Sequence, residues 1–126
     1  RAGEVGDKKG VHLPDTPLRL ELPTDRDRAD ISLARELGVD MLGVSFVSRP
    51  DEVRAIRRLA PDTMIIGKVE RMAALENLKG LLAECDGLMV ARGDLGVEAE
   101  LEELPMIQKN ILAAAIQAGK FTITAT

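Results

Sequence analysis

The sequence lacks several features that would place it in common functional classes. Its 126 residues include a single cysteine, Cys85, which we expect in the core. No disulfide can form within the chain, and a reducing compartment such as the cytoplasm fits best. No apolar stretch approaches the roughly 20 residues of a membrane-spanning helix, and no segment resembles a secretory signal. The net charge of −4 supplies no overall attraction for nucleic-acid phosphates.

What the sequence does contain is a repeated alternation of helix and strand signals. Residues 1–17 differ from the rest: they are rich in Gly, Lys, Asp and Pro, and they predict a short strand and a linker. From Thr24 onward, apolar residues at helical spacing alternate with short continuous apolar runs. Helices are predicted from a Thr24–Asp27 capping box to Gly38, after a Ser48 cap, through residues 72–82, and from Leu101 to Gly119. Strands are predicted at 39–47, 63–69, 87–91 and 121–126, the first of them buried on both faces.

This alternation predicts an α/β fold with parallel strands joined by right-handed crossovers. Four such units cannot close an eight-stranded (β/α)8 barrel, which typically needs about 250 residues. The chain would therefore supply only part of a barrel. An open doubly wound sheet also fits the pattern, although no Gly-rich dinucleotide-binding fingerprint follows the first strand.

Two consecutive apolar runs end in acidic residues. Glu70 closes the run that begins at Met64, and Asp94 follows the run at 88–91. Because parallel strands end at one edge, the two carboxylates could share a Mg²⁺ ion, which takes one or two carboxylates together with waters and substrate oxygens. Either acid alone could equally be a solvated helix-start charge, and the matching positions of the pair favour the metal.

Three further residues are candidates for chemistry at this edge. Lys68 precedes Glu70 by two residues, so both side chains should share a strand face, where a lysine can stabilise developing negative charge. Gly93 lets a ligand approach the backbone, and the turn that Asp94 opens has free N–H groups for an anion. Thr126 falls at the end of the last strand, where a hydroxyl could relay a proton.

Other polar positions have ordinary explanations. The tripeptide at 92–94 spells Arg-Gly-Asp, but adhesion ligands need an exposed flexible loop and this segment should follow a buried strand. Ser45 and Phe46 are expected to pack at the mouth of the sheet. His12 has no partner motif. Lys9 could touch a nucleotide phosphate or lie in a solvated turn.

Four segments resemble the pyruvate kinase family, in the family's order and over nearly the whole chain. Met89-Val90-Ala91-Arg92-Gly93-Asp94-Leu95-Gly96 is similar to the family's most recognisable stretch. Lys68-Val69-Glu70, Lys9-Gly10-Val11-His12-Leu13-Pro14 and Ile123-Thr124-Ala125-Thr126 resemble three others.

The resemblance implies that residues 1–17 end an inserted lid-like B domain and that residues 18–126 form roughly the second half of the catalytic (β/α)8 barrel. It implies transfer of a phosphoryl group from phosphoenolpyruvate to ADP, giving pyruvate and ATP. The parent enzyme would be a cytoplasmic homotetramer that uses Mg²⁺ or Mn²⁺, with K⁺ bound by residues outside this chain. It would have no nucleic-acid or membrane partner, and the isolated chain is expected to be inactive.

The resemblance also implies a role for each matching residue. Lys68 would stabilise the transferring phosphoryl group and the enolate, and Glu70 with Asp94 would bind the metal. The Gly93 and Asp94 amides would hold the substrate carboxylate. Thr126 would contact substrate near the proton-delivery step.

The resemblance further places Lys9 against the nucleotide, from the B domain. Two alternatives stay open: a class II aldolase-type lyase, which also uses a Glu/Asp metal pair in a similar barrel, and a non-catalytic binding module.

Overall fold

The computed structural model describes residues 6–7 and 22–126, so the predictions for Lys9, His12 and the strand and linker of residues 1–17 fall almost entirely outside the described residues. Four strands form one sheet in the order β1-β2-β3-β4, and every neighbouring pair is parallel, as predicted. The strands are β1 (Met41–Val44), β2 (Met64–Val69), β3 (Gly87–Ala91) and β4 (Phe121–Ala125).

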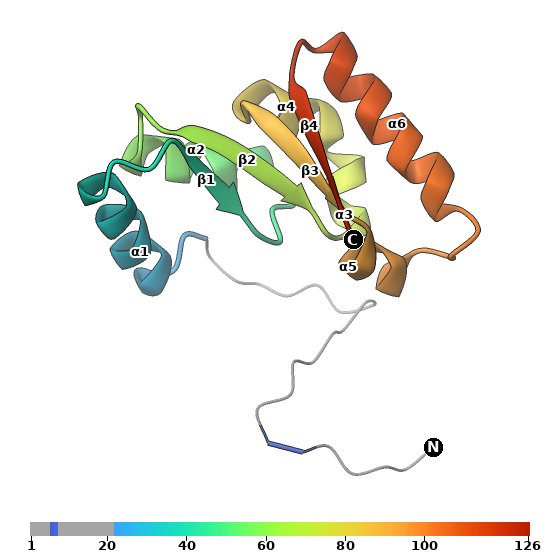
Figure 1. Ribbon diagram of the computed structural model, residues 1–126, viewed down its shortest axis with the longest axis horizontal. Coiled ribbons are helices and arrows are strands. Elements are labelled where there is room, and N and C mark those ends of the chain that lie inside the picture. The colour runs from blue at the N-terminus through green and yellow to red at the C-terminus, as the bar shows by residue number, and fades with distance from the viewer. Residues whose placement is uncertain (1–5, 8–21) are drawn as a thin grey trace.

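Helices α2, α4 and α6 form a layer on one face of this sheet, and α5 lies at the carboxyl ends of the strands (Figure 1). Helix α2 packs against α4, α4 packs against α6, and α1 packs beside α2. No helix in the described part of the chain is both long and apolar enough to cross a membrane. The helices are α1 (Asp25–Glu36), α2 (Pro50–Leu59), α3 (Met72–Glu76), α4 (Leu78–Glu84), α5 (Arg92–Glu98) and α6 (Leu104–Gln117).

One apolar core lies between the sheet and the helix layer. Ile65 and Leu88 of the central strands are fully buried there, against residues such as Val53 and Ile111. Each such side chain contributes roughly 1.5–3 kcal/mol through removal from water. Cys85 belongs to the same cluster, as predicted.

The opposite face of the sheet is more exposed. Met41 of β1 is 49% exposed and Met64 of β2 is 38% exposed. The prediction of a strand at 39–47 is wrong in its limits, because β1 spans only four residues. Within this chain its exposure alternates, because one face packs on helices and the other does not.

Helix α1 begins as predicted, but it buries a different face. Thr24 and Asp27 form the capping box, and Gly38 follows the helix with a positive φ of 66°. Ile31 is the buried residue, whereas Leu33 is 53% and Leu37 is 70% exposed. Leu33 and Leu37, although four residues apart at helical spacing, therefore do not form its packing side.

Helix α2 starts after Arg49, not at a Ser48 cap. The Glu52 carboxylate accepts hydrogen bonds from the Ser48 and Arg49 N–H groups, both at 2.9 Å, so an acid in the first turn replaces the expected serine side chain. The segment predicted as one helix over 72–82 is two, because Asn77 ends α3 and precedes α4. Similarly, α6 begins at Leu104 and leaves Leu101 in a turn.

Arg57 and Asp86 join the amino ends of the two central strands. Arg57 Nη2 lies 2.5 Å from Asp86 Oδ2, and Arg57 Nη1 donates to the Thr63 carbonyl. Asp86 Oδ2 also accepts the Ile65 N–H at 2.7 Å. Burial acts to raise the pKa of Asp86, but the hydrogen bonds from Arg57 and Ile65 and the charges of Arg57 and Lys120 outweigh it, so the pKa lies below its ordinary value.

Candidate functional site

The carboxyl ends of the four strands lie at one edge of the sheet, because all four are parallel. This edge carries Ser45 after β1, Lys68 and Glu70 at the end of β2, Asp94 shortly after β3, and Thr126 after β4. It therefore holds every predicted site residue that the structure describes. In parallel α/β barrels the corresponding rim is where ligands bind and chemistry occurs.

Glu70 is a buried carboxylate with two partners. Its residue is 2% exposed. Oε1 lies 2.6 Å from Lys68 Nζ, and Oε2 accepts the Phe46 N–H at 2.5 Å. A carboxylate removed from water is costly unless it is paired and hydrogen-bonded, and both conditions hold here. The ordinary explanation, a solvated loop acid, does not describe Glu70.

Lys68 is held between two strands. Its side chain is 27% exposed, and Nζ donates to Ser45 Oγ at 2.9 Å as well as contacting Glu70. Lys68 and Glu70 thus share a strand face, as their spacing predicted. The ammonium has a fixed position at the strand ends, where it can act on negative charge in a bound molecule.

Phe46 has an unusual backbone conformation, and its N–H group donates a hydrogen bond to Glu70. Its φ is 55°, and it is the one residue other than glycine with positive φ in the described part of the chain. Such a conformation is rare for a bulky residue and persists where the surrounding structure holds it. Here it accompanies the 2.5 Å hydrogen bond from the Phe46 N–H to Glu70. Phe46 as a residue is 50% exposed within this chain, and its expected packing role stays a prediction.

Asp94 lies in the first turn of α5. Its residue is exposed, and no hydrogen bond or ion pair of its side chain occurs among the described residues. The Arg92-Gly93-Asp94 tripeptide forms this helical turn and not an extended loop, which disfavours the adhesion hypothesis. The N–H groups of Gly93 and Asp94 have no acceptor within the helix, because the first turn leaves such groups unpaired.

The ends of β3 and β4 are tied together beside Asp94. Arg92 Nε donates to the Ala125 carbonyl at 2.9 Å. A Cβ atom on Gly93 would lie 3.4 Å from the Thr126 carbonyl oxygen, an ordinary van der Waals contact, so the two backbones lie side by side here. The structure therefore brings Thr126 next to the turn that carries Asp94.

A buried ion pair joins the chain segment after Glu70 to α5, the helix that carries Asp94. Arg71 follows Glu70, and its Nε lies 3.0 Å from Oε1 of Glu98, the last residue of α5. Glu98 Oε2 also accepts the Met72 N–H at 2.7 Å. The sequence interpretation missed this pair, because nothing in the local spacing links residues 27 positions apart.

The donor atoms at this edge fit a hard divalent cation. Glu70 and Asp94 offer carboxylate oxygens from neighbouring strand ends, which matches the one or two carboxylates that Mg²⁺ takes while keeping waters and substrate oxygens. Among the described residues no group of three or more His, Cys, Asp or Glu side chains is placed to hold a metal ion.

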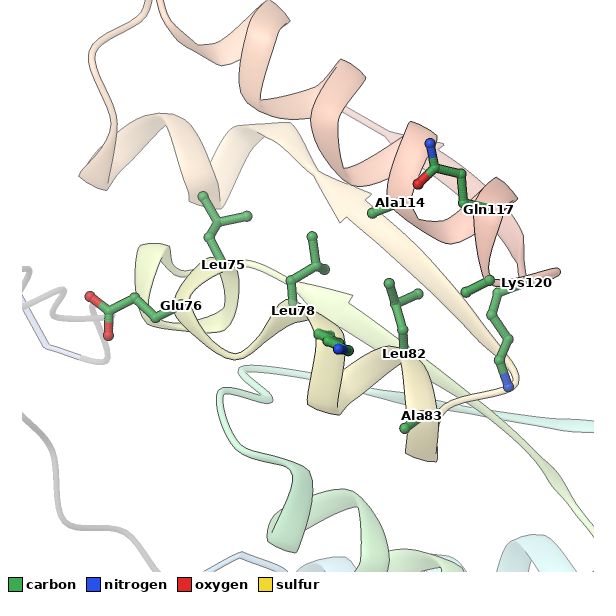
Figure 2. Close-up of a pocket in the computed structure, with 10 residues that line it drawn as sticks. Leu75, Glu76, Leu78, Leu82, Ala83, Ala114, Gln117 and Lys120 are labelled. Carbon is green, nitrogen blue, oxygen red and sulfur yellow. The ribbon is translucent and has the colours of Figure 1, made fainter.

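A hollow lies away from the strand ends, in the helix layer. It has a volume of about 700 Å³ between α3–α4 and α6. Figure 2 shows Leu75, Leu78 and Leu82 pointing toward α6, with Lys120 at one end. None of the predicted site residues lines it, so it is distinct from the strand-end cluster.

Comparison with known proteins decides the family. The family model described as "Pyruvate kinase, barrel domain" matches residues 1–126. The chain belongs to the pyruvate kinase family. It is 41% identical over 129 residues to a pyruvate kinase of Clostridium perfringens, covering 98% of this chain and 27% of that protein. It is 43% identical over 130 residues to that of Bacillus licheniformis, covering 99% and 22%, and 38% identical over 128 residues to "Pyruvate kinase 2" of Synechocystis, covering 98% and 22%.

The chain thus spans about a quarter of the length of the pyruvate kinases it matches. Its four parallel strands and single helix layer form part of a (β/α)8 barrel. The doubly wound alternative is wrong, because that fold places helices on both faces of its sheet. The match to pyruvate kinases also decides against the aldolase-type alternative.

Proposed function

We propose that the protein carrying this sequence transfers a phosphoryl group from phosphoenolpyruvate to ADP. In this reaction the bond between the enol oxygen and phosphorus breaks, and an oxygen of the ADP β-phosphate bonds to phosphorus. The enolate left behind takes a proton at carbon to give pyruvate. The observation that carries the proposal is the Lys68–Glu70 pair on one strand end, with the Asp94 carboxylate on the next.

Glu70 and Asp94 would hold Mg²⁺ or Mn²⁺, which when bound supplies positive charge to oxygens of the transferring group. The Lys68 ammonium would stabilise the negative charge on the phosphoryl group and then on the enolate oxygen. Its contacts with Ser45 and Glu70 hold it in place, so little reorganisation is needed.

Other residues would orient the substrate. The free N–H groups of Gly93 and Asp94 would bind its carboxylate, since the first turn of α5 directs them away from the helix. Thr126 would lie near the carbon that receives the proton, which its proximity to Gly93 supports. Lys9 would contact the nucleotide.

The remaining assignments rest on family membership. Residues 1–17 would end the lid domain, and residues 18–126 would belong to the catalytic barrel. K⁺ would be bound by residues outside this chain, and the protein would act as a homotetramer in the cytoplasm. The 126 residues alone would lack activity, since they span 22–27% of their relatives' length.

The test is pyruvate formation from phosphoenolpyruvate and ADP, with Mg²⁺ and K⁺, by the natural protein and its Lys68→Ala variant. We expect the variant to lose activity by about 100-fold or more, as for other charge-stabilising groups. Lys109→Ala, at an exposed position of α6, is the matched control and should keep full activity. No ADP-dependent pyruvate formation by the natural protein would rule the proposal out.

A further inference from the structure

Glu98 connects the chain segment after Glu70 to helix α5, which carries Asp94. Its Oε1 lies 3.0 Å from Arg71 Nε and its Oε2 accepts the Met72 N–H at 2.7 Å. Both donors come directly after Glu70 in the chain. The side chains of Arg71 and Glu98 are 18% and 7% exposed, so the pair is largely removed from solvent.

The position of Glu98 on α5 relates it to Asp94. The two acids are four residues apart, and residues with this spacing lie on the same face of a helix, one turn apart. The face of α5 that carries Asp94 is therefore the face that Glu98 holds against residues 71–72. The contact fixes how α5 is turned with respect to the end of β2.

The position of Asp94 depends on how α5 is placed, because its own side chain has no protein partner among the described residues. Within the same residues, Arg71–Glu98 is the ion pair that joins α5 to the segment after β2. Glu70, in contrast, is fixed directly by Lys68 and Phe46. Glu70 is thus held by its own ion pair and hydrogen bond, whereas Asp94 is placed by helix α5, on which it lies.

We propose that Glu98, with Arg71, is a positioning residue that sets the placement of Asp94 relative to Glu70 and thereby the affinity for a divalent cation. This inference rests on the proposed function, in which Glu70 and Asp94 hold the metal. Partners that orient metal ligands without touching the metal typically affect affinity by about 10- to 100-fold when they are replaced.

The experiment measures binding of Mn²⁺ alone to the natural protein, from the electron paramagnetic resonance signal of free Mn²⁺. Glu98→Gln removes the charge but keeps an oxygen for the Met72 N–H. We expect it to raise the Mn²⁺ dissociation constant by about 10-fold or more. Arg71→Gln, which still carries a donor for Glu98, is a second variant that should act in the same direction to a smaller extent.

A matched control separates positioning from general stability. Glu84 is also the last residue of its helix, and its Oε1 lies 2.9 Å from Arg54 Nη1, away from the strand ends that carry the site. Glu84→Gln should leave the Mn²⁺ dissociation constant at its natural value. Urea unfolding without metal records the stability of each variant, so a purely structural role would change unfolding and leave Mn²⁺ affinity intact in the folded protein.

Asp94→Asn distinguishes failure of this inference from failure of the proposed metal site. If Asp94→Asn weakens Mn²⁺ binding while folded Glu98→Gln and Arg71→Gln bind as tightly as the natural protein, the positioning role is wrong and the metal site stands. If Asp94→Asn binds Mn²⁺ as tightly as the natural protein, the proposed metal site is wrong, and the positioning role with it.

Discussion

Lys68 Nζ and Glu70 Oε1 lie 2.6 Å apart at the end of β2, and this ion pair is the centre of the candidate site. The Glu70 side chain is almost fully buried, while Lys68 keeps partial contact with solvent. The negative charge of Glu70 is therefore compensated by Lys68 on the same strand, even without a ligand. A cation that binds there would share Glu70 with Lys68.

Substitutions of Lys68 and Glu70 should have non-additive effects on the free energy of unfolding. Lys68→Met leaves a buried carboxylate whose remaining partner among the described residues is the Phe46 N–H, and we expect a loss of about 2 kcal/mol in the free energy of unfolding. The double variant Lys68→Met/Glu70→Gln should lose less than the sum of the single changes, because it leaves no unpaired charge. Urea unfolding of the four proteins measures this coupling, and strict additivity would contradict it.

The Arg57–Asp86 contact should make stability depend on acid pH. Burial acts to raise the pKa of Asp86, but Arg57, the Ile65 N–H and Lys120 lower it by a larger amount, so the net shift is downward. A lowered pKa in the folded state stabilises the protein above the unfolded value of about 3.9, and this contribution disappears as pH falls toward the folded pKa. The stability difference between the natural protein and Asp86→Asn should therefore shrink below about pH 4 in urea unfolding. A constant difference across this window would show that the ionised carboxylate is not responsible.

Cys85 should be chemically inert in the folded protein. Burial raises the pKa of its thiol to about 11, and the residue has no exposed surface. The reactive thiolate is therefore scarce near neutral pH and inaccessible. We expect iodoacetamide at pH 8 to modify Cys85 only after urea is added, as measured by mass spectrometry of its peptide. Equal labelling with and without urea would contradict this burial.

Gly67 should not tolerate a methyl group. A Cβ atom there would lie 2.8 Å from Cys85 Sγ and 3.2 Å from Leu88 Cδ2. We expect Gly67→Ala to lower stability by about 1–3 kcal/mol, the usual cost of overpacking, and Cys85→Ala to restore part of it. Gly43→Ala on β1 is the matched control, because its nearest atom would be Lys68 Cδ at an ordinary 3.9 Å. Similar losses for the two glycine variants would point to backbone effects and not to crowding.

The sequence predicts three of the four strands to within one residue, together with the strand-end residues, because both depend on local patterns. Continuous apolar runs mark strands buried in a parallel sheet, and β3 was predicted with its exact limits. The Lys68–Glu70 contact follows from the two-residue period of a strand. The number of units also matched, since each run is separated from the next by a helical segment.

What the sequence did not predict depends on distant neighbours. Leu33 of α1 and Leu37 at its carboxyl end lie at helical spacing, yet both are exposed, because the face that a helix buries depends on where its neighbour α2 lies. The break at Asn77 contains neither glycine nor proline, the residues that usually mark helix ends. Phe46 and Glu98 act through a backbone N–H and an ion pair with segments far along the chain, for which spacing gives no signal.

Strand β2 has one charged pair at each of its ends, and the two pairs have different roles. Arg57 and Asp86 join strands at its amino end, and Lys68 and Glu70 form the site at its carboxyl end. The two pairs share no residue and no hydrogen bond. A substitution that redesigns the chemistry at the carboxyl end therefore removes no bond that holds the sheet together at the amino end. Natural variation and laboratory selection can accordingly alter the two ends independently.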